Sequence, residues 1–345
     1  MTAMGSLTNS YVQLSAFLRV PSCADAAQAP GSEWDKLALE LQAALQHRAD
    51  TWDWLERVLQ VRSRARVLAA RDMDAALLHG LQALSRNGAG AVGAQALCRM
   101  LVASEVARAL GYGAALIAHL ERAALMLSVP MVVLRERMGR VIATQPGEPV
   151  AELLRRYAED AVLLALEEAD GDPVWLEAVR QHRVAVSEAL PPTFMTSAQH
   201  LAVLLRRVDR FCTRMALSRR APVTTLQAAG GADADACTAQ HAGHDPIGAA
   251  LVQAVGLYPL GSLVQLESGE AGMVLARGRR AEQPLVAVFA DLRRAQPLPL
   301  NPQLSDTAHP GRAVSALLCA DQFPLPASLQ ALLQLRTPGS GMRAA

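Results

Sequence analysis

The sequence is poor in lysine and in aromatic residues. Lys36 is the single lysine among 345 residues, and Phe, Trp and Tyr together make up only 4%. The hydrophobic share of 51% therefore consists mostly of Ala, Leu and Val, a composition that favours helix over sheet. Lys and Arg number 33 against 32 Asp and Glu, so the basic excess of a nucleic-acid-binding protein is missing. We expect a mainly α-helical protein that binds no nucleic acid.

Paired cysteines and long apolar runs are also missing. No two cysteines form a CxxC pair and their number is odd, which argues against a disulfide framework or a zinc ribbon. The apolar run 123–134 is too short to span a bilayer, and residues 1–20 lack the basic start of a signal peptide. We therefore expect a cytoplasmic protein without membrane insertion, whose thiols are reduced. The cysteines are Cys23, Cys98, Cys212, Cys237 and Cys319.

Helical periodicity runs through most of the first 226 residues. Ser32 and Asp35 have the spacing of a capping box, Asp72 is placed to cap a later helix, and Gly111 is placed to end one. Apolar stripes at helical spacing follow each of these signals. The expected helices begin after Ser32, Asp50 and Asp72, and then cover residues 95–110, 114–127, 150–169, 173–188 and 197–217.

The pattern changes after residue 226. An Ala-, Gly- and Asp-rich stretch predicts a linker, in which Cys237, His241 and His244 lack a scaffold that would hold a metal. A short helix is expected over 247–255, followed by strands over 263–266, 272–276 and 285–289. The expected organisation is an N-terminal helical region 1–70, a helical domain 71–226, a linker 227–245, a C-terminal helix with a small β unit 246–330, and a tail 331–345.

The C-terminal part carries the most specific motif. Asp245-Pro246, then Gly256-Leu-Tyr-Pro-Leu-Gly-Ser-Leu-Val264, then Gly269-Glu270 resembles the segment that closes bacterial HD-GYP domains. The order and spacing of the helices are similar as well, so that the resemblance covers roughly residues 70–290. It implies an HD-GYP-like helical bundle with a small C-terminal β appendix. The family hydrolyses cyclic di-GMP with iron or manganese ions held by His and Asp side chains.

The metal ligands of that family are mostly absent at the matching positions. Only His182 and Asp209 could bind a metal there, and two ligands cannot fix a dimetal centre. We therefore expect no cofactor, with iron or manganese only if the ligands align differently, and an apolar vestigial site in which Arg183 could pair with Asp209. The positions of the vestigial site are Gln95, Leu127, Ser128, Met131, Tyr157, His182, Arg183 and Asp209.

Three functions remain open from the sequence. The leading hypothesis is a non-catalytic bacterial signalling protein that acts through protein partners or by binding cyclic di-GMP, with Arg206 and Arg207 as the best-placed phosphate ligands. The alternatives are a metal-dependent phosphodiesterase with residual activity and a protein-interaction scaffold without a ligand. A serine hydrolase is disfavoured, because no GxSxG motif is present.

Overall fold

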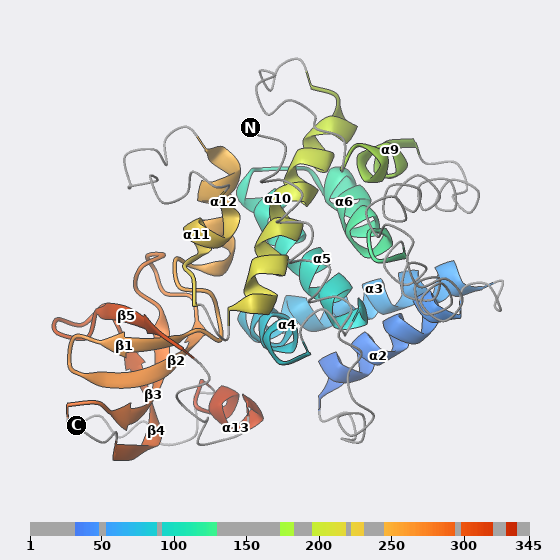
Figure 1. Cartoon of the computed structure of the whole chain (residues 1–345). Helices are drawn as coiled ribbons and strands as arrows, with labels where there is room; N and C mark the ends of the chain where they lie inside the picture. Colours follow the sequence, from blue (N-terminus) through green and yellow to red (C-terminus); the bar gives the residue numbers. More distant parts are fainter. Residues whose placement is uncertain are drawn as a thin grey trace, which may run out of the picture.

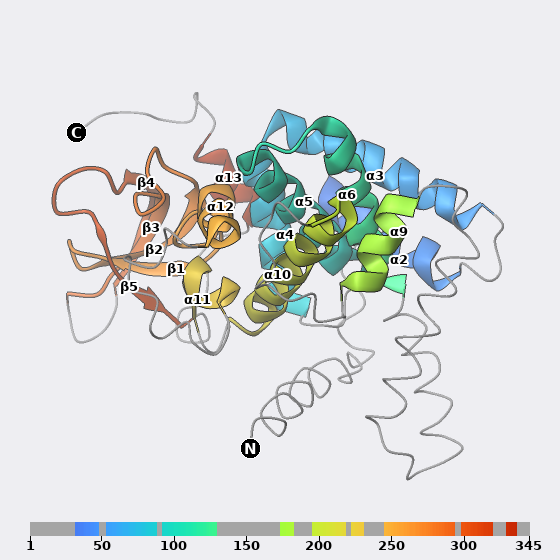
Figure 2. The same ribbon diagram turned by 90° about the horizontal axis from the view of Figure 1, so that it is seen from above.

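The structure is a computed structural model of the chain, and two parts can be recognised in it. Helices pack into a body at one side, and an antiparallel sheet lies at one end of that body, in both views (Figures 1 and 2). This arrangement confirms the expected mainly helical protein with a small C-terminal β unit. The residues that the structure describes are 32–47, 53–87, 92–129, 173–182, 195–218, 222–230, 245–293, 298–319 and 329–336.

Of the first three described helices, the first and the third begin where their capping signals predict, and Asp50, the expected start signal of the second, lies outside the described residues. Helix α2, Glu33–Gln46, starts with a complete capping box between Ser32 and Asp35. Helix α3 spans Trp54–Arg71, and α4 spans Met73–Asn87 with Asp72 accepting a hydrogen bond from the backbone of Ala75. The apolar stripes of α2 and α4 are buried as expected; their buried leucines are Leu37, Leu41, Leu45, Leu77, Leu78, Leu81 and Leu84.

Helix α5 is the centre of the body (Figure 1). It spans Val92–Ala109, and every residue from Val92 to Ser104 is buried. The chain leaves it through Gly111, whose φ of +77° is the left-handed conformation expected for this glycine. Helix α6, Ala114–Met126, then packs against α5. A helix enclosed on all sides can carry a polar side chain only where a partner meets it.

Two further helices complete the part of the body that carries the site. Helix α9, Pro173–Gln181, begins with the expected proline, and α10, Ser197–Leu217, has the bounds that its periodicity predicts. A short helix, α11, Thr225–Ala229, occupies the start of the expected linker, because Thr224 caps it and Ala228 and Ala229 are buried. The expected helix 150–169 and the Cys237, His241 and His244 group lie outside the described residues.

The C-terminal unit contains more strands than the sequence predicts. Helix α12, Pro246–Val255, is capped by Asp245, as expected. Within the described residues, five strands form an antiparallel sheet in the order β4-β3-β2-β1-β5. The elements are β1 Leu263–Leu266, β2 Glu270–Ala276, β3 Leu285–Asp291, β4 Leu298–Asp306, β5 Val314–Leu318 and helix α13 Leu329–Gln334.

Strands β4 and β5 were missed because their sequences carry weak strand signals. Pro299 and Pro302 lie within β4, and proline cannot donate a hydrogen bond to a neighbouring strand. Strand β4 pairs only with β3, so it lies at an edge of the sheet, where proline is tolerated. Strand β5, at the other edge, has no fully buried residue and no regular apolar alternation.

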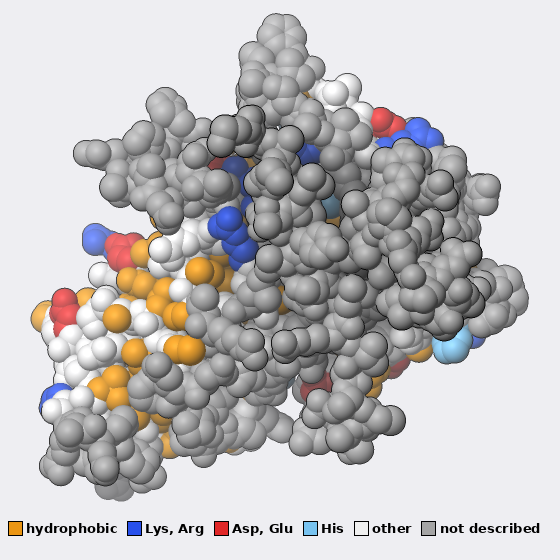
Figure 3. All heavy atoms as spheres, in the orientation of Figure 1, with side chains coloured by type: hydrophobic (Ala, Val, Ile, Leu, Met, Phe, Trp, Pro, Cys, Tyr) orange, Lys and Arg blue, Asp and Glu red, His pale blue; other side chains and the backbone are white. Residues whose placement is uncertain are grey.

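The β unit docks on the helical body, as its small size predicts. Val264 and Val274 are buried, and Tyr258 packs partly buried against the same core. The side-chain amide of Gln82 on α4 donates a hydrogen bond of 2.8 Å to the carbonyl of Gly261. Hydrophobic and uncharged side chains cover much of the described surface at this end of the molecule (Figure 3). The unit is therefore part of the folded body.

Arg277, directly after β2, is the main polar link between the two parts. Its Nε lies 2.5 Å from Asp74 Oδ1 on α4, and its Nη1 lies 3.2 Å from Glu105 Oε2 on α5. The same Nη1 donates to the carbonyl of Ala254 at 2.8 Å. Because one guanidinium group contacts α4, α5 and α12, its removal affects all three contacts together.

Replacing Arg277 with methionine should therefore loosen the β unit. We expect a loss of about 2 kcal/mol in unfolding free energy, because two partly buried carboxylates lose their shared cation. Chemical unfolding would measure the loss, and hydrogen exchange should become faster in β2 and α12. Arg280→Met, at an exposed position of the β2–β3 connection, is the matched control. Equal stability of the two variants would contradict this role of Arg277.

Candidate functional site

A buried arginine lies where four helices of the body meet. Helix α10 contacts α5, α6 and α9, and α6 contacts α5 and α9 (Figure 1). Arg99 of α5 makes hydrogen bonds to α10 and to the end of α6. Its side chain is only 4% exposed. A guanidinium group is charged at every accessible pH, so its burial requires acceptors for its N–H groups.

Those acceptors come from two other helices. The Nε and Nη2 atoms of Arg99 lie 2.8 and 2.7 Å from Asp209 Oδ1 on α10. Its Nη1 donates to Ser128 Oγ at 3.0 Å and to the carbonyl of Ala124 at 3.2 Å, at the end of α6. Arg99 thus ties α5, α6 and α10 together through one fixed positive charge.

His182 adds the fourth helix to this site. It follows α9, is 8% exposed, and places Nε2 3.9 Å from Asp209 Oδ2. Its backbone carbonyl accepts a 3.0 Å hydrogen bond from Arg206 Nε on α10. The structure therefore brings together Ser128, His182 and Asp209, three positions of the expected vestigial site that lie far apart in the chain. Arg206, expected as a phosphate ligand, lies beside them.

Of the remaining residues expected in the site, two are among the described residues and three are not. Gln95 is buried on α5, one helical turn before Arg99, and Leu127 is partly buried against the core. Met131, Tyr157 and Arg183 lie outside the described residues. The structure shows Arg99 as a partner of Asp209, because α5 brings its side chain beside α10, while the expected pairing of Asp209 with Arg183 stays a prediction.

Arg207 has a structural partner of its own. Its guanidinium group is paired with the carboxylate of Asp245, and that carboxylate also accepts a 2.9 Å hydrogen bond from the backbone of Gly248 at the start of α12. The side chain of Arg207 is 13% exposed. It therefore links α10 to α12, and a phosphate would have to compete with Asp245 for it.

The described donor set does not fit a dimetal centre. In the described part of the chain, no group of three or more His, Cys, Asp or Glu side chains is arranged to hold a metal ion. Asp209 is engaged by the guanidinium group of Arg99, which supplies the positive charge that a metal would otherwise supply at this carboxylate. A second cation at the same position would be repelled by the first.

Two thiols lie next to the site on the same helices. Cys98 precedes Arg99 on α5, and Cys212 follows Asp209 by one turn on α10; both are fully buried and free. A hydrogen bond with Cys212, together with burial, raises the pKa of the Cys98 thiol well above its usual value. The thiol therefore stays protonated at neutral pH and is a poor nucleophile.

Arg99 is the site residue that sequence reasoning missed. The signal was present, because Arg99 is the single charged residue between Val92 and Ser104, a stretch with no polar face. A lone charge in an otherwise apolar helix predicts a buried ion pair. The partner could not be predicted, since Asp209 lies 110 residues further along the chain.

Comparison with known proteins finds similarity to part of a cyclic di-GMP phosphodiesterase. This chain is 31% identical over 165 residues to Cyclic di-GMP phosphodiesterase PA4108 of Pseudomonas aeruginosa. The aligned region is 46% of this chain and 39% of the relative, so the chain spans well under half of the relative's length. No protein-family model and no solved structure matches the chain at a significant level.

A helix that spans a bilayer must be both long and apolar. In the described ranges, none of the helices is both long enough and apolar enough to cross a membrane. Charged residues interrupt even the most buried helix, α5, at Arg99, Glu105 and Arg108.

Proposed function

We propose that this chain is an HD-GYP-type protein of cyclic di-GMP signalling that does not hydrolyse the nucleotide. It acts as a regulatory module through protein partners, and cyclic di-GMP is the ligand that its similarity to PA4108 supports best. Arg206 and Arg207 are the residues proposed to reach a phosphate, from their positions on α10.

The observation that carries the proposal is the contact of Arg99 with Asp209 and Ser128. Metal-dependent hydrolysis needs a cation that binds water and lowers its pKa. A guanidinium group offers only N–H donors and cannot bind a water oxygen as a Lewis acid. A site whose carboxylate is engaged by arginine can thus keep the fold of such an enzyme without its chemistry.

The first test is turnover. Purified full-length protein, incubated with cyclic di-GMP and manganese, iron or magnesium, is expected to form no linear product above a protein-free blank. The phosphodiesterase PA4108 serves as the positive control. Product that increases with protein concentration and disappears in His182→Ala would instead support a metal-dependent phosphodiesterase that uses His182 and Asp209.

The second test is binding. Calorimetric titration with cyclic di-GMP should show saturable binding that Arg206→Gln weakens about tenfold, the loss expected for one charge-assisted hydrogen bond. Arg57→Gln, at an exposed position on α3, is the control and should bind like the parent. Absence of any binding would favour a protein-interaction scaffold without a nucleotide ligand.

A further inference from the structure

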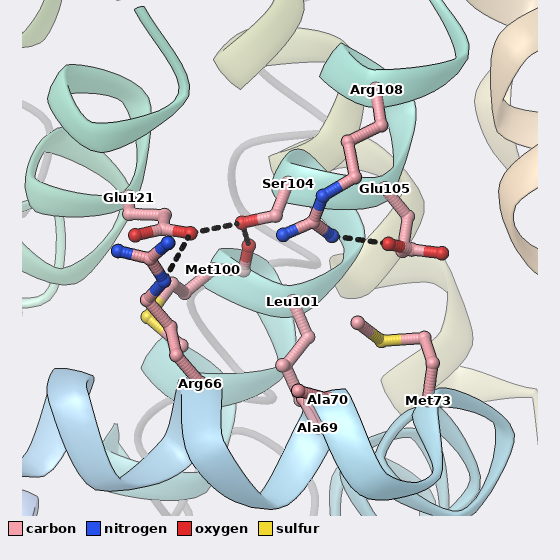
Figure 4. Close-up of a pocket in the computed structure, with 10 residues that line it drawn as sticks. All are labelled: Arg66, Ala69, Ala70, Met73, Met100, Leu101, Ser104, Glu105, Arg108 and Glu121. Atoms are coloured by element: carbon pink, nitrogen blue, oxygen red, sulfur yellow. Dashed lines mark hydrogen bonds and ion pairs between the residues drawn. The ribbon is translucent and has the colours of Figure 1, made fainter. Parts of the chain in front are cut away.

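A cavity of about 410 Å³ opens between α3 and α5, away from the site described above. Figure 4 shows its apolar part at the contact of the two helices, with Met73 of α4 beside it. The apolar lining consists of Ala69, Ala70, Met73, Met100 and Leu101. The other half of the lining is polar and consists of Arg66, Ser104, Glu105, Arg108 and Glu121. A cavity of this volume with one apolar and one polar side could hold a small molecule that has both kinds of surface.

The polar side of the cavity is built around a buried carboxylate. Glu121 of α6 is 1% exposed and accepts hydrogen bonds from Arg62 at 2.8 Å and from Ser104 Oγ at 3.0 Å. Arg66 Nε lies further away, 3.8 Å from the same carboxylate, and the Arg66 side chain is 52% exposed. Arg62 and Ser104 therefore compensate Glu121, and Arg66 is not needed to hold it.

A second arginine lies on the other side of Ser104. Arg108 pairs with Glu105, but Glu105 is also held by Arg277 at 3.2 Å. Figure 4 shows the guanidinium groups of Arg66 and Arg108 extending to either side of Ser104. Both arginines are about half exposed, so they are accessible from solvent at the mouth of the cavity.

The ion pairs around the cavity contain more arginines than carboxylates. Among the described residues, these ion pairs form two separate groups. In the first, Arg62 and Arg66 of α3 both meet Glu121 of α6, so this group has one arginine more than carboxylates. In the second, three arginines and three carboxylates balance; they are Arg108, Arg277, Arg336, Asp72, Asp74 and Glu105. The unbalanced positive charge thus belongs to the Glu121 group, and Arg66 carries it to the cavity.

We propose that this cavity is a binding site for a small amphipathic carboxylate, a single anionic head group on an apolar body. The head group lies between Arg66 and Arg108, where a planar guanidinium group suits a carboxylate. The apolar body covers Ala69, Ala70 and Leu101 and is removed from water there. This site is independent of the proposed cyclic di-GMP function and goes beyond it.

Octanoate is the probe for the test, and calorimetric titration of the full-length protein is the measurement. We expect saturable binding that Arg66→Gln and Arg108→Gln each weaken about tenfold, the effect of one charge-assisted hydrogen bond. Arg64→Gln is the matched control, because Arg64 is a neighbouring, 51% exposed arginine of α3 that pairs with Glu40 outside the cavity. It should bind octanoate like the parent.

Two further experiments distinguish binding in this cavity from non-specific adsorption of octanoate to the protein surface. Ala70→Phe, at an exposed position of the lining, should fill the cavity and abolish octanoate binding while leaving cyclic di-GMP binding unchanged. Octan-1-ol, which has the same chain without the charge, should bind at least about tenfold more weakly. Absence of octanoate binding, equal binding of octan-1-ol, or normal octanoate binding by Ala70→Phe would each overturn the proposal.

Discussion

Replacing Arg99 with methionine is expected to lower the free energy of unfolding by about 3 kcal/mol, the lower end of the range for breaking a buried ion pair. The substitution keeps an unbranched side chain of similar length but removes the donors to Asp209, Ser128 and the carbonyl of Ala124. The lower end applies because the Asp209 side chain is 32% exposed, so water partly compensates its charge. Urea unfolding followed by circular dichroism would measure the loss.

A second substitution and a control make this result specific. Arg99→Met combined with Asp209→Leu should recover at least half of the loss, because an apolar pair can replace a buried ion pair at little cost. Arg57→Met removes a pair with Asp53 at a surface where the arginine is 55% exposed, and should change stability by less than about 0.5 kcal/mol. Equal effects of Arg99→Met and Arg57→Met would show that Arg99 does not organise the site.

Gly93→Ala is the second substitution with a large expected effect, and its sign depends on tertiary structure. By helix propensity alone, alanine should stabilise a helix by up to about 1 kcal/mol relative to glycine. In the structure, however, a Cβ atom on Gly93 would lie 2.0 Å from the carbonyl oxygen of Ala38 and 2.9 Å from the backbone nitrogen of Gln42. We expect a loss of about 3 kcal/mol, the upper part of the range for overpacking a core, because α2 must move away from α5.

The control for Gly93 is another glycine that has space around it. Gly113 precedes α6, has a φ of −69°, and a Cβ atom there would meet no atom within 4 Å. Gly113→Ser should leave stability unchanged or raise it by a few tenths of a kcal/mol, since serine caps a helix slightly better than glycine. Thermal melting of both variants would show the contrast. A Gly93→Ala protein as stable as its parent would mean that α2 and α5 are not packed this closely.

The consequence of Arg99 for function is that the site has a permanent positive charge. A metal ion can leave or exchange its ligands, whereas a guanidinium group on a buried helix is covalently attached and always protonated. It fixes α5, α6 and α10 in one arrangement. This rigidity would suit the proposed module, which presents a surface to protein partners.

Much of the fold follows from local signals in the sequence. Ser32 with Asp35, Thr196 with Gln199, and Asp245 before Pro246 each begin a helix, because their side chains satisfy backbone N–H groups of the first turn. Strand β1 has the bounds that its apolar pattern predicts. Strand β4 was missed, since an edge position that tolerates prolines is a property of the assembled sheet.

Local patterns in the sequence were enough to predict where most of the described helices begin and end, and the family resemblance predicted that Ser128, His182 and Asp209 lie close together. The contact of Arg99 with Asp209 could be found only in the folded structure. Helix caps and apolar stripes involve residues about three to seven positions apart, so they can be recognised in a sequence whose fold is not known. The partner of Arg99 lies 110 residues away, and the neighbour that excludes a side chain at Gly93 lies on another helix. Both contacts depend on how the helices pack, because residues of other helices decide whether a side chain is buried and whether there is space for it.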